Sequence, residues 1–223
     1  MTEDGRTAGF MALPGRTEDR REVFAGALED VVRVLGLEVA AEPESADGIT
    51  WVHRARAALR EVWRDGAVLS DEAFDSLLRA AVHDPNPSFN RQFVEPALNA
   101  FGHRRVQAAL LAYLRTGTDP ERAGAARAWY WSALSLRMPL VRAEHPAAAD
   151  DGADVVKEWY EAALREFVHN EHVDVRRCVL PLLPLRKSSY PPELHDLVDE
   201  AVAIARSHPD EYIRHRVEHQ VSD

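Results

Sequence analysis

Three glutamate-histidine pairs are the residues of this sequence whose types could do metal chemistry. The pairs are Glu144-His145, Glu171-His172 and Glu218-His219. Carboxylate oxygens and imidazole nitrogens hold zinc or iron only when several of them converge on one point. Two of the pairs fall in predicted loops and not at equivalent positions of predicted helices. We therefore interpret all three pairs as solvated surface residues, and we expect no metal ion and no other cofactor.

The sequence also lacks the short motifs of the common catalytic classes. It contains no His-Glu-x-x-His run, no phosphate-binding loop, no Gly-x-Ser-x-Gly elbow and no Gly-x-Gly-x-x-Gly fingerprint. Cys178 is the single cysteine, so no disulfide can form within the chain, which indicates a reducing compartment. No apolar run has the length of a membrane span. We expect a non-enzymatic, cytoplasmic protein that does not contact a membrane.

A cluster of aromatic and basic residues could bind nucleic acid. Its members are Trp129, Tyr130, Trp131, Arg91, Arg104, Arg105 and Arg127. Aromatic rings stack on bases, and guanidinium groups contact phosphates. The net charge of −10 opposes such binding, although residues 49–148 carry 13 basic and 10 acidic side chains. We therefore expect a protein or peptide partner and keep nucleic acid as the alternative.

The elements that must position these residues are all predicted to be helices, because apolar residues recur every three or four positions and no segment alternates as a strand would. Residues 1–16 show no period and are predicted to be a disordered lead-in. Residues 17–66 are predicted to form a capping pair of helices that begins at Thr17. Further helices are predicted over residues 70–83, 88–101, 103–116, 120–136, 153–169, 173–185, 192–207 and 210–220, with an acidic, alanine-rich insertion at 138–151.

One stretch of the sequence repeats. Residues 91–98 read Arg-Gln-Phe-Val-Glu-Pro-Ala-Leu and residues 176–183 read Arg-Arg-Cys-Val-Leu-Pro-Leu-Leu, so Arg, Val, Pro and Leu occupy the same places. Weaker copies place arginines at positions 127 and 214, which makes the intervals 36, 49 and 38 residues. The longest interval contains the insertion. Such spacing is typical of repeat proteins in which stacked helix pairs share one core.

The turn Asp84-Pro-Asn-Pro-Ser-Phe-Asn-Arg91 and the helix that Gly102 closes resemble the HEAT-repeat family. The resemblance implies an all-α, right-handed α-solenoid of antiparallel helix pairs, with HEAT-like repeats over residues 70–223. It also implies a scaffold that binds a protein or peptide partner in its concave groove. HEAT-like DNA-binding proteins and alkylpurine-type DNA glycosylases are the alternative. The scarcity of lysine, with only Lys157 and Lys187, and the abundance of alanine indicate a high-GC bacterial source.

The second helix of each pair is predicted to line the concave groove. At about 100° per residue, Phe93, Trp129, Tyr130 and Cys178 fall on the packing side of their helices. The opposite stripe holds the candidate partner-binding residues Arg91, Glu95, Asn99, Arg127, Trp131, Ser135 and Leu180. An exposed Trp131 one turn after Arg127 could form a cation–π pair with it and anchor a partner.

The same residues also have structural interpretations, and the sequence favours the structural one for the recurring arginines. The recurring arginines could bond a turn aspartate or a carbonyl of the neighbouring repeat. Trp131 could be covered by the insertion at 138–151. Pro96 and Pro181 are predicted to kink their helices, and Cys178 to be inert core.

If the arginines serve structure, Arg176→Ala lowers the stability of the fold. Arg176 heads a repeat unit whose preceding turn carries Glu171 and Asp174. Losing a charge-assisted hydrogen bond should lower the free energy of unfolding by about 1.5–3 kcal/mol, measured by urea titration. An unchanged unfolding midpoint together with a lost partner would assign Arg176 to recognition.

Overall fold

The computed structural model of the protein describes residues 11–39, 49–64, 69–137 and 152–221, with the backbone alone for residues 49–50, 61–64 and 135–137. These residues form ten α-helices and three one-turn 3-10 helices, with no strand among them. The α-helices are α1 (Arg21–Val34), α2 (Ile49–Arg64), α3 (Asp71–His83), α4 (Arg91–Phe101), α5 (His103–Thr116), α6 (Asp119–Arg137), α8 (Ala153–His169), α9 (Val173–Val179), α10 (His195–Ser207) and α11 (Glu211–Val221). The 3-10 helices are η2 (Leu180–Leu182), η3 (Lys187–Ser189) and η4 (Pro192–Leu194). The prediction of an all-α protein is confirmed.

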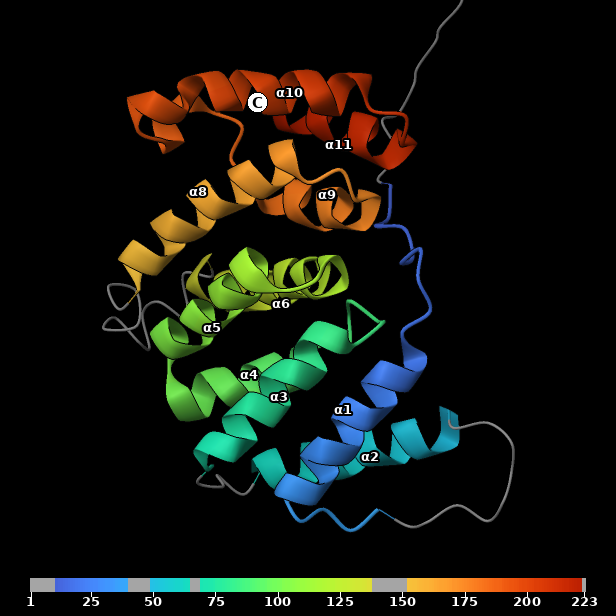
Figure 1. The fold of residues 1–223 in the computed structure, drawn as a ribbon. Coiled ribbons are helices and arrows are strands. Elements are labelled where there is room, and N and C mark those ends of the chain that lie inside the picture. The colour runs from blue at the N-terminus through green and yellow to red at the C-terminus, as the bar shows by residue number, and fades with distance from the viewer. Residues whose placement is uncertain (1–10, 40–48, 65–68, 138–151, 222–223) are drawn as a thin grey trace, which may run out of the picture.

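The helices stack in pairs along the molecule, from α1 and α2 at one end to α10 and α11 at the other (Figure 1). Consecutive helices pack as α3 with α4, α5 with α6, α8 with α9 and α10 with α11. Successive pairs then touch through two rows. Helices α1, α3, α5, α8 and α10 contact one another in order, as do α2, α4, α6, α9 and α11. One continuous core runs through the stack because each pair leaves apolar side chains for the next pair to cover.

The helix ends follow the sequence signals that are local. The Ser70 hydroxyl accepts a hydrogen bond from a first-turn N–H and caps α3, and Gly102, with φ of +80°, ends α4. The helix predicted over residues 173–185 is shorter in the structure. Helix α9 ends at Val179 and gives way to η2, because Pro181 has no N–H with which to continue the hydrogen-bond ladder.

The N-terminal segment of residues 11–20 runs along the stack beside several helix pairs (Figure 1). Arg16 donates from Nη2 to the carbonyl oxygen of Val82 near the end of α3, over 2.9 Å. Thr17 donates from its backbone N and its Oγ1 to Oδ2 of Asp174 in α9, over 2.7 and 2.8 Å. The segment therefore ties together two layers that are far apart in sequence.

These contacts change two expectations for the N-terminus. The predicted lead-in of residues 1–16 was expected to be disordered, but its described part, residues 11–16, packs on the helices, and Met11 and Leu13 are partly buried against the core. Helix α1 begins at Arg21 and not at Thr17, because the side chain and amide of Thr17 bond to α9 and so do not cap α1.

A buried ion pair fixes α2 against the turn between α3 and α4. Arg56 Nη2 lies 2.7 Å from Asp84 Oδ2, and the two side chains are 6% and 0% exposed. Burial raises the pKa of Asp84, and the charge of Arg56 opposes that rise. The Arg56 guanidinium also lies against the rings of Phe24, Phe89 and Phe93. Removing one partner of such a pair typically costs about 3–5 kcal/mol, because a buried charge is left alone.

Three of the four recurring arginines, at positions 127, 176 and 214, bond to backbone carbonyls at turns and helix ends. Arg176 donates to the carbonyls of Phe167 and Val168 in the last turn of α8, over 3.1 and 3.2 Å. Arg127 of α6 donates to the carbonyl of Pro85 in the turn after α3, over 3.1 Å. Carbonyls at the end of a helix have no partner within it, so these arginines satisfy acceptors that would otherwise be unpaired.

Asp174 has a different partner from the one expected. Its carboxylate pairs with Arg177 over 3.4 Å, while Arg176 turns to the carbonyls of α8. Arg177 also donates from Nε to Asp210 Oδ2 over 3.1 Å. This second ion-pair chain joins α9 to the turn that precedes α11.

Helix α6 is surrounded by α3, α4, α5 and α9. Its buried residues are Ala123, Gly124, Ala125, Ala126, Arg127, Ala128, Trp129 and Ser132. A Cβ atom on Gly124 would lie 1.9 Å from the carbonyl oxygen of Val82, far inside van der Waals contact. Glycine is therefore required where α6 crosses the end of α3.

We predict that Gly124→Ala destabilises the protein by at least about 1–3 kcal/mol, because the added methyl group forces α3 and α6 apart. Gly26→Ala in α1 is the matched control, since a Cβ there meets nothing within 4 Å. Alanine favours helix over glycine, so the control should raise the free energy of unfolding by up to about 1 kcal/mol. Urea unfolding of both variants measures the difference. Equal effects would contradict the close approach.

Candidate functional site

A hollow of about 480 Å³ lies against α6, α9 and α11. Its walls carry aromatic, apolar and arginine side chains, which is the composition of sites that receive part of a ligand. The lining residues are Met11, Ala12, Leu13, Pro87, Ser88, Ala126, Arg127, Tyr130, Trp131, Cys178, Pro181, Leu182, Tyr212 and Arg216. The hollow thus lies on the row of helices predicted to face the partner.

A second hollow, of about 420 Å³, follows α4. Its lining residues are Arg60, Ser88, Phe89, Arg91, Gln92, Glu95, Pro96 and Asn99. The two hollows share Ser88, and the Arg91 guanidinium carbon lies 5.6 Å from the centre of the Trp131 ring at their boundary. We call the two hollows together the inner groove.

Trp131 is half-buried, and its polar edge is committed to the fold. Its Nε1 donates to Asn90 Oδ1 over 2.7 Å and to the Pro87 carbonyl over 3.0 Å. The expectation of an exposed indole is therefore wrong in part, because one ring edge holds the turn between α3 and α4. The cation over the ring is Arg91 and not Arg127, since Arg127 points to the carbonyl of Pro85.

Two of the predicted partner-binding residues belong to the interior. Leu180 is fully buried, because η2 turns the chain and directs this side chain into the core. Arg127 is only 6% exposed, although it forms part of the wall of the larger hollow. The side chain of Ser135 lies outside the described residues, as does the insertion at 138–151.

Three predicted residues of α4 do lie together at the surface. Arg91, Glu95 and Asn99 are exposed and line the smaller hollow. Arg91 Nε donates to Glu95 Oε1 over 2.6 Å, one helical turn away. Glu95 is the only carboxylate among the described lining residues of the two hollows, and it is paired.

Sequence reasoning missed two exposed aromatic residues of the groove. Phe89 is 41% exposed and Tyr130 is 43% exposed, whereas Tyr130 was predicted to pack with Trp129. The sequence of α6 does not show which side of the helix faces solvent. Other helices cover most of its surface, and its many small residues form no apolar stripe. The signal available was Phe89 in a proline-rich turn, where an apolar side chain has no helical face to pack on.

Tyr212 and Arg216 were also missed. They lie one turn apart on α11 and line the larger hollow, but the repeat pattern singled out Arg214 instead. Arg214 donates to the carbonyl of Pro209 over 2.7 Å and so has the same kind of partner as Arg176. An i, i+4 aromatic–arginine pair in the last helix was the signal that could have found them.

Cys178, the single thiol of the chain, lines the larger hollow. Cys178 is buried, and burial raises the pKa of its thiol to about 11, so the nucleophilic thiolate is disfavoured. In the part of the chain that the structure describes, no three His, Cys, Asp or Glu side chains gather as metal ligands. Glu171-His172 and Glu218-His219 lie there without forming such a group, and Glu144-His145 lies outside it.

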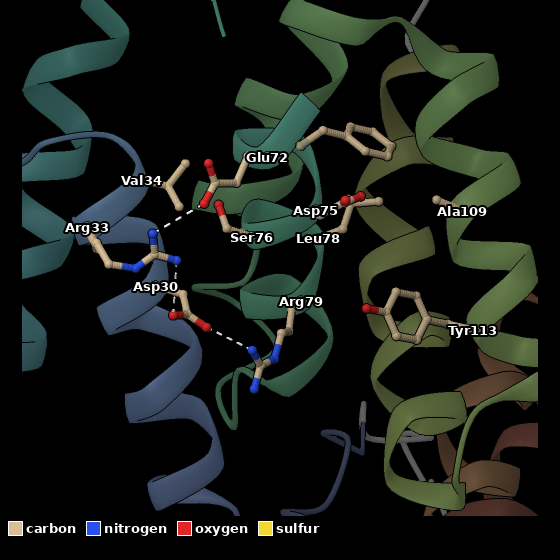
Figure 2. Close-up of a pocket in the computed structure, with 11 residues that line it drawn as sticks. Asp30, Arg33, Val34, Glu72, Asp75, Ser76, Leu78, Arg79, Ala109 and Tyr113 are labelled. Carbon is tan, nitrogen blue, oxygen red and sulfur yellow. Dashed lines mark hydrogen bonds and ion pairs between the residues drawn. The ribbon is translucent and has the colours of Figure 1, made fainter. Parts of the chain in front are cut away.

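A third hollow, of about 300 Å³, lies between α1, α3 and α5 (Figure 2). Figure 2 shows Arg33 between Asp30 and Glu72, with Arg79 turned toward Asp30. The nitrogen-oxygen distance is 3.5 Å from Arg33 to Asp30, 3.2 Å from Arg33 to Glu72 and 2.8 Å from Arg79 to Asp30. Asp30, Arg33, Glu72 and Arg79 thus pair with one another, and Asp75 adds a further carboxylate to the lining of this hollow.

Comparison of the chain with protein-family models, with curated proteins and with solved structures finds no match. Among the described helices, none combines the length and the apolar character needed to cross a membrane.

The hydrogen bonds of Trp131 predict that Trp131→Phe lowers the free energy of unfolding by about 1–2 kcal/mol, because the carbonyl of Pro87 and the buried Asn90 lose their donor. Tyr130→Phe on the preceding residue is the control. It removes an exposed hydroxyl and should change stability by less than about 0.5 kcal/mol. Thermal and urea unfolding of the two variants provide the comparison. Equal stabilities would show that the hydrogen bonds of Trp131 do not stabilise the fold.

Proposed function

We propose that this protein is a HEAT-like, right-handed α-solenoid whose inner groove binds a peptide segment of another protein. The proposal takes the two rows of stacked helices as HEAT-like repeats, with the row α2, α4, α6, α9 and α11 on the concave side. It makes the protein a non-enzymatic scaffold. The proposed contact surface is the inner groove, with Trp131 and Arg127 as parts of its wall and Arg91, Glu95 and Asn99 along its rim.

The exposed aromatic side chains at the groove are the observation that carries this proposal. Phe89 and Tyr130 present rings to solvent at the two hollows, on either side of Ser88. Exposed aromatic side chains beside concave surfaces are the commonest anchors of protein interfaces, because they bury a large area with few rotatable bonds. A peptide in the groove would cover both rings.

Nucleic acid is the second candidate, because arginines and aromatic rings share the same groove. A HEAT-like glycosylase would need a carboxylate beside the rings. The described lining of the larger hollow contains no Asp or Glu, and Glu95 of the smaller hollow is engaged by Arg91. Together with the net charge of −10, this favours a peptide.

The proposal predicts that the full-length protein selects peptides from a display library of random 12-residue sequences. Tyr130→Ala should weaken the binding of a selected peptide by about 2 kcal/mol, which is roughly a thirtyfold rise in Kd, measured by fluorescence anisotropy. The control is Arg206→Ala, a substitution of an exposed residue of α10 that lines neither hollow.

Two results would contradict the proposed function. The first is a library from which wild type enriches no peptide, or from which it enriches peptides that Tyr130→Ala binds equally well. The second is a gel shift in which alkylated or abasic duplex DNA binds the wild type at physiological salt and Tyr130→Ala does not. That result would indicate that the inner groove binds nucleic acid and not a peptide.

A further inference from the structure

Arg127 carries hydrogen-bond donors that the fold does not use. Its side chain is 6% exposed, and only Nη2 has a partner, the carbonyl of Pro85. The Nε and Nη1 atoms are buried and have no hydrogen-bond partner in the described protein. Unpaired donors on a buried cation are costly, so an acceptor from outside the chain, either water or a ligand, would stabilise Arg127.

A second arginine in the same wall is also incompletely paired. Arg216 reaches the carbonyl of Pro181 from Nη2 over a long 3.4 Å, and its Nε is buried without a partner. The nearby carboxylates are already engaged. Asp174 accepts hydrogen bonds from Thr17 and pairs with Arg177, and Asp84 pairs with Arg56.

Positive charge therefore accumulates behind this wall. Burial and then the charge of Arg127 lower the pKa of Arg16 to about 10, while Asp174 and Asp84 act in the opposite sense. The described lining of the larger hollow contains Arg127 and Arg216 and no acidic residue. In a protein of net charge −10, this hollow is a local site of opposite sign.

One side of the larger hollow is held, among the described residues, by apolar contacts and not by hydrogen bonds. Met11, Ala12 and Leu13 line it, and no hydrogen bond joins residues 11–15 to the helices in the described structure. The anchors of the segment, Arg16 and Thr17, lie further along the chain. Displacing residues 11–13 would therefore break apolar contacts but none of the hydrogen bonds of the described structure.

We infer that the larger hollow is an acid-binding pocket, in which a carboxylate side chain of the bound peptide accepts hydrogen bonds from Arg127 and Arg216. The inference rests on the proposed peptide-binding function and names the chemistry of its anchor. A carboxylate has two charged oxygens and can accept a hydrogen bond from each of the two arginines, whereas a neutral amide has one uncharged acceptor oxygen. Tyr130, Trp131 and Tyr212 would surround the aliphatic part of the acidic side chain.

The test compares peptides selected from the random 12-residue library by full-length wild type and by Arg127→Gln. Wild type should enrich Asp and Glu, and Arg127→Gln should not. For a selected peptide, changing its acidic residue to the amide should weaken binding to wild type about tenfold or more, and binding to Arg127→Gln less than about twofold. Arg206→Gln on α10 is the matched control and should behave as wild type.

Circular dichroism and melting first establish which variants fold. If Arg127→Gln is unfolded, Arg216→Gln, a partly exposed residue, carries the same comparison and should show the same loss of acid selectivity. Selected peptides without acidic enrichment, or an acid-to-amide effect of equal size in wild type and the folded variant, would overturn the acid-binding pocket and leave peptide binding intact. A failure of wild type to select any peptide would overturn the proposed function, and this inference with it.

Discussion

The close approach of α6 to α3 at Gly124 is the constraint on which the rest of the structure depends. With the Val82 carbonyl where a Cβ would be, α6 can cross the end of α3 only through glycine. The neighbouring alanines allow α4, α5 and α9 to pack around the same helix. Because α6 lies in the middle of the stack, its small residues set the spacing of the pairs on both sides.

Charge holds the turns of the stack in place. Asp84 pairs with Arg56 at one level, and Asp174, Arg177 and Asp210 form a chain at another. Such buried pairs add little net stability compared with apolar contacts, but each is costly to break, so they fix which turn meets which helix. Carbonyl-capping arginines such as Arg176 extend the same principle to the helix ends.

The inner groove differs from the third hollow, between α1, α3 and α5, in the partners of its arginines. In the hollow between α1, α3 and α5, Arg33 and Arg79 both pair with the carboxylate of Asp30. In the larger inner hollow, Arg127 and Arg216 have only carbonyl partners and keep free N–H groups. The same side chain can therefore support a turn through one nitrogen and present another to a ligand, which makes the structural and binding readings of Arg127 compatible.

Local sequence signals determined the helices and most of their ends. Apolar periodicity, the Ser70 cap and Gly102 act within a few residues, so the observed bounds of α5 and α8 coincide with those predicted. The repeat of arginines likewise predicted a structural role, and carbonyl partners for Arg176 and Arg127 agree with it.

The tertiary structure decided what each side chain faces. Thr17 carries a helix-capping signal, but Asp174, far along the chain, offers it a stronger partner. Leu180 follows the arginine register of the repeat, yet Pro181 ends the helix and turns that side chain inward. Tyr130 is exposed where packing was expected, and Trp131 is half-buried where exposure was expected. Helix α6 contacts four other helices, so its sequence shows no clear apolar stripe from which the exposed side could be predicted.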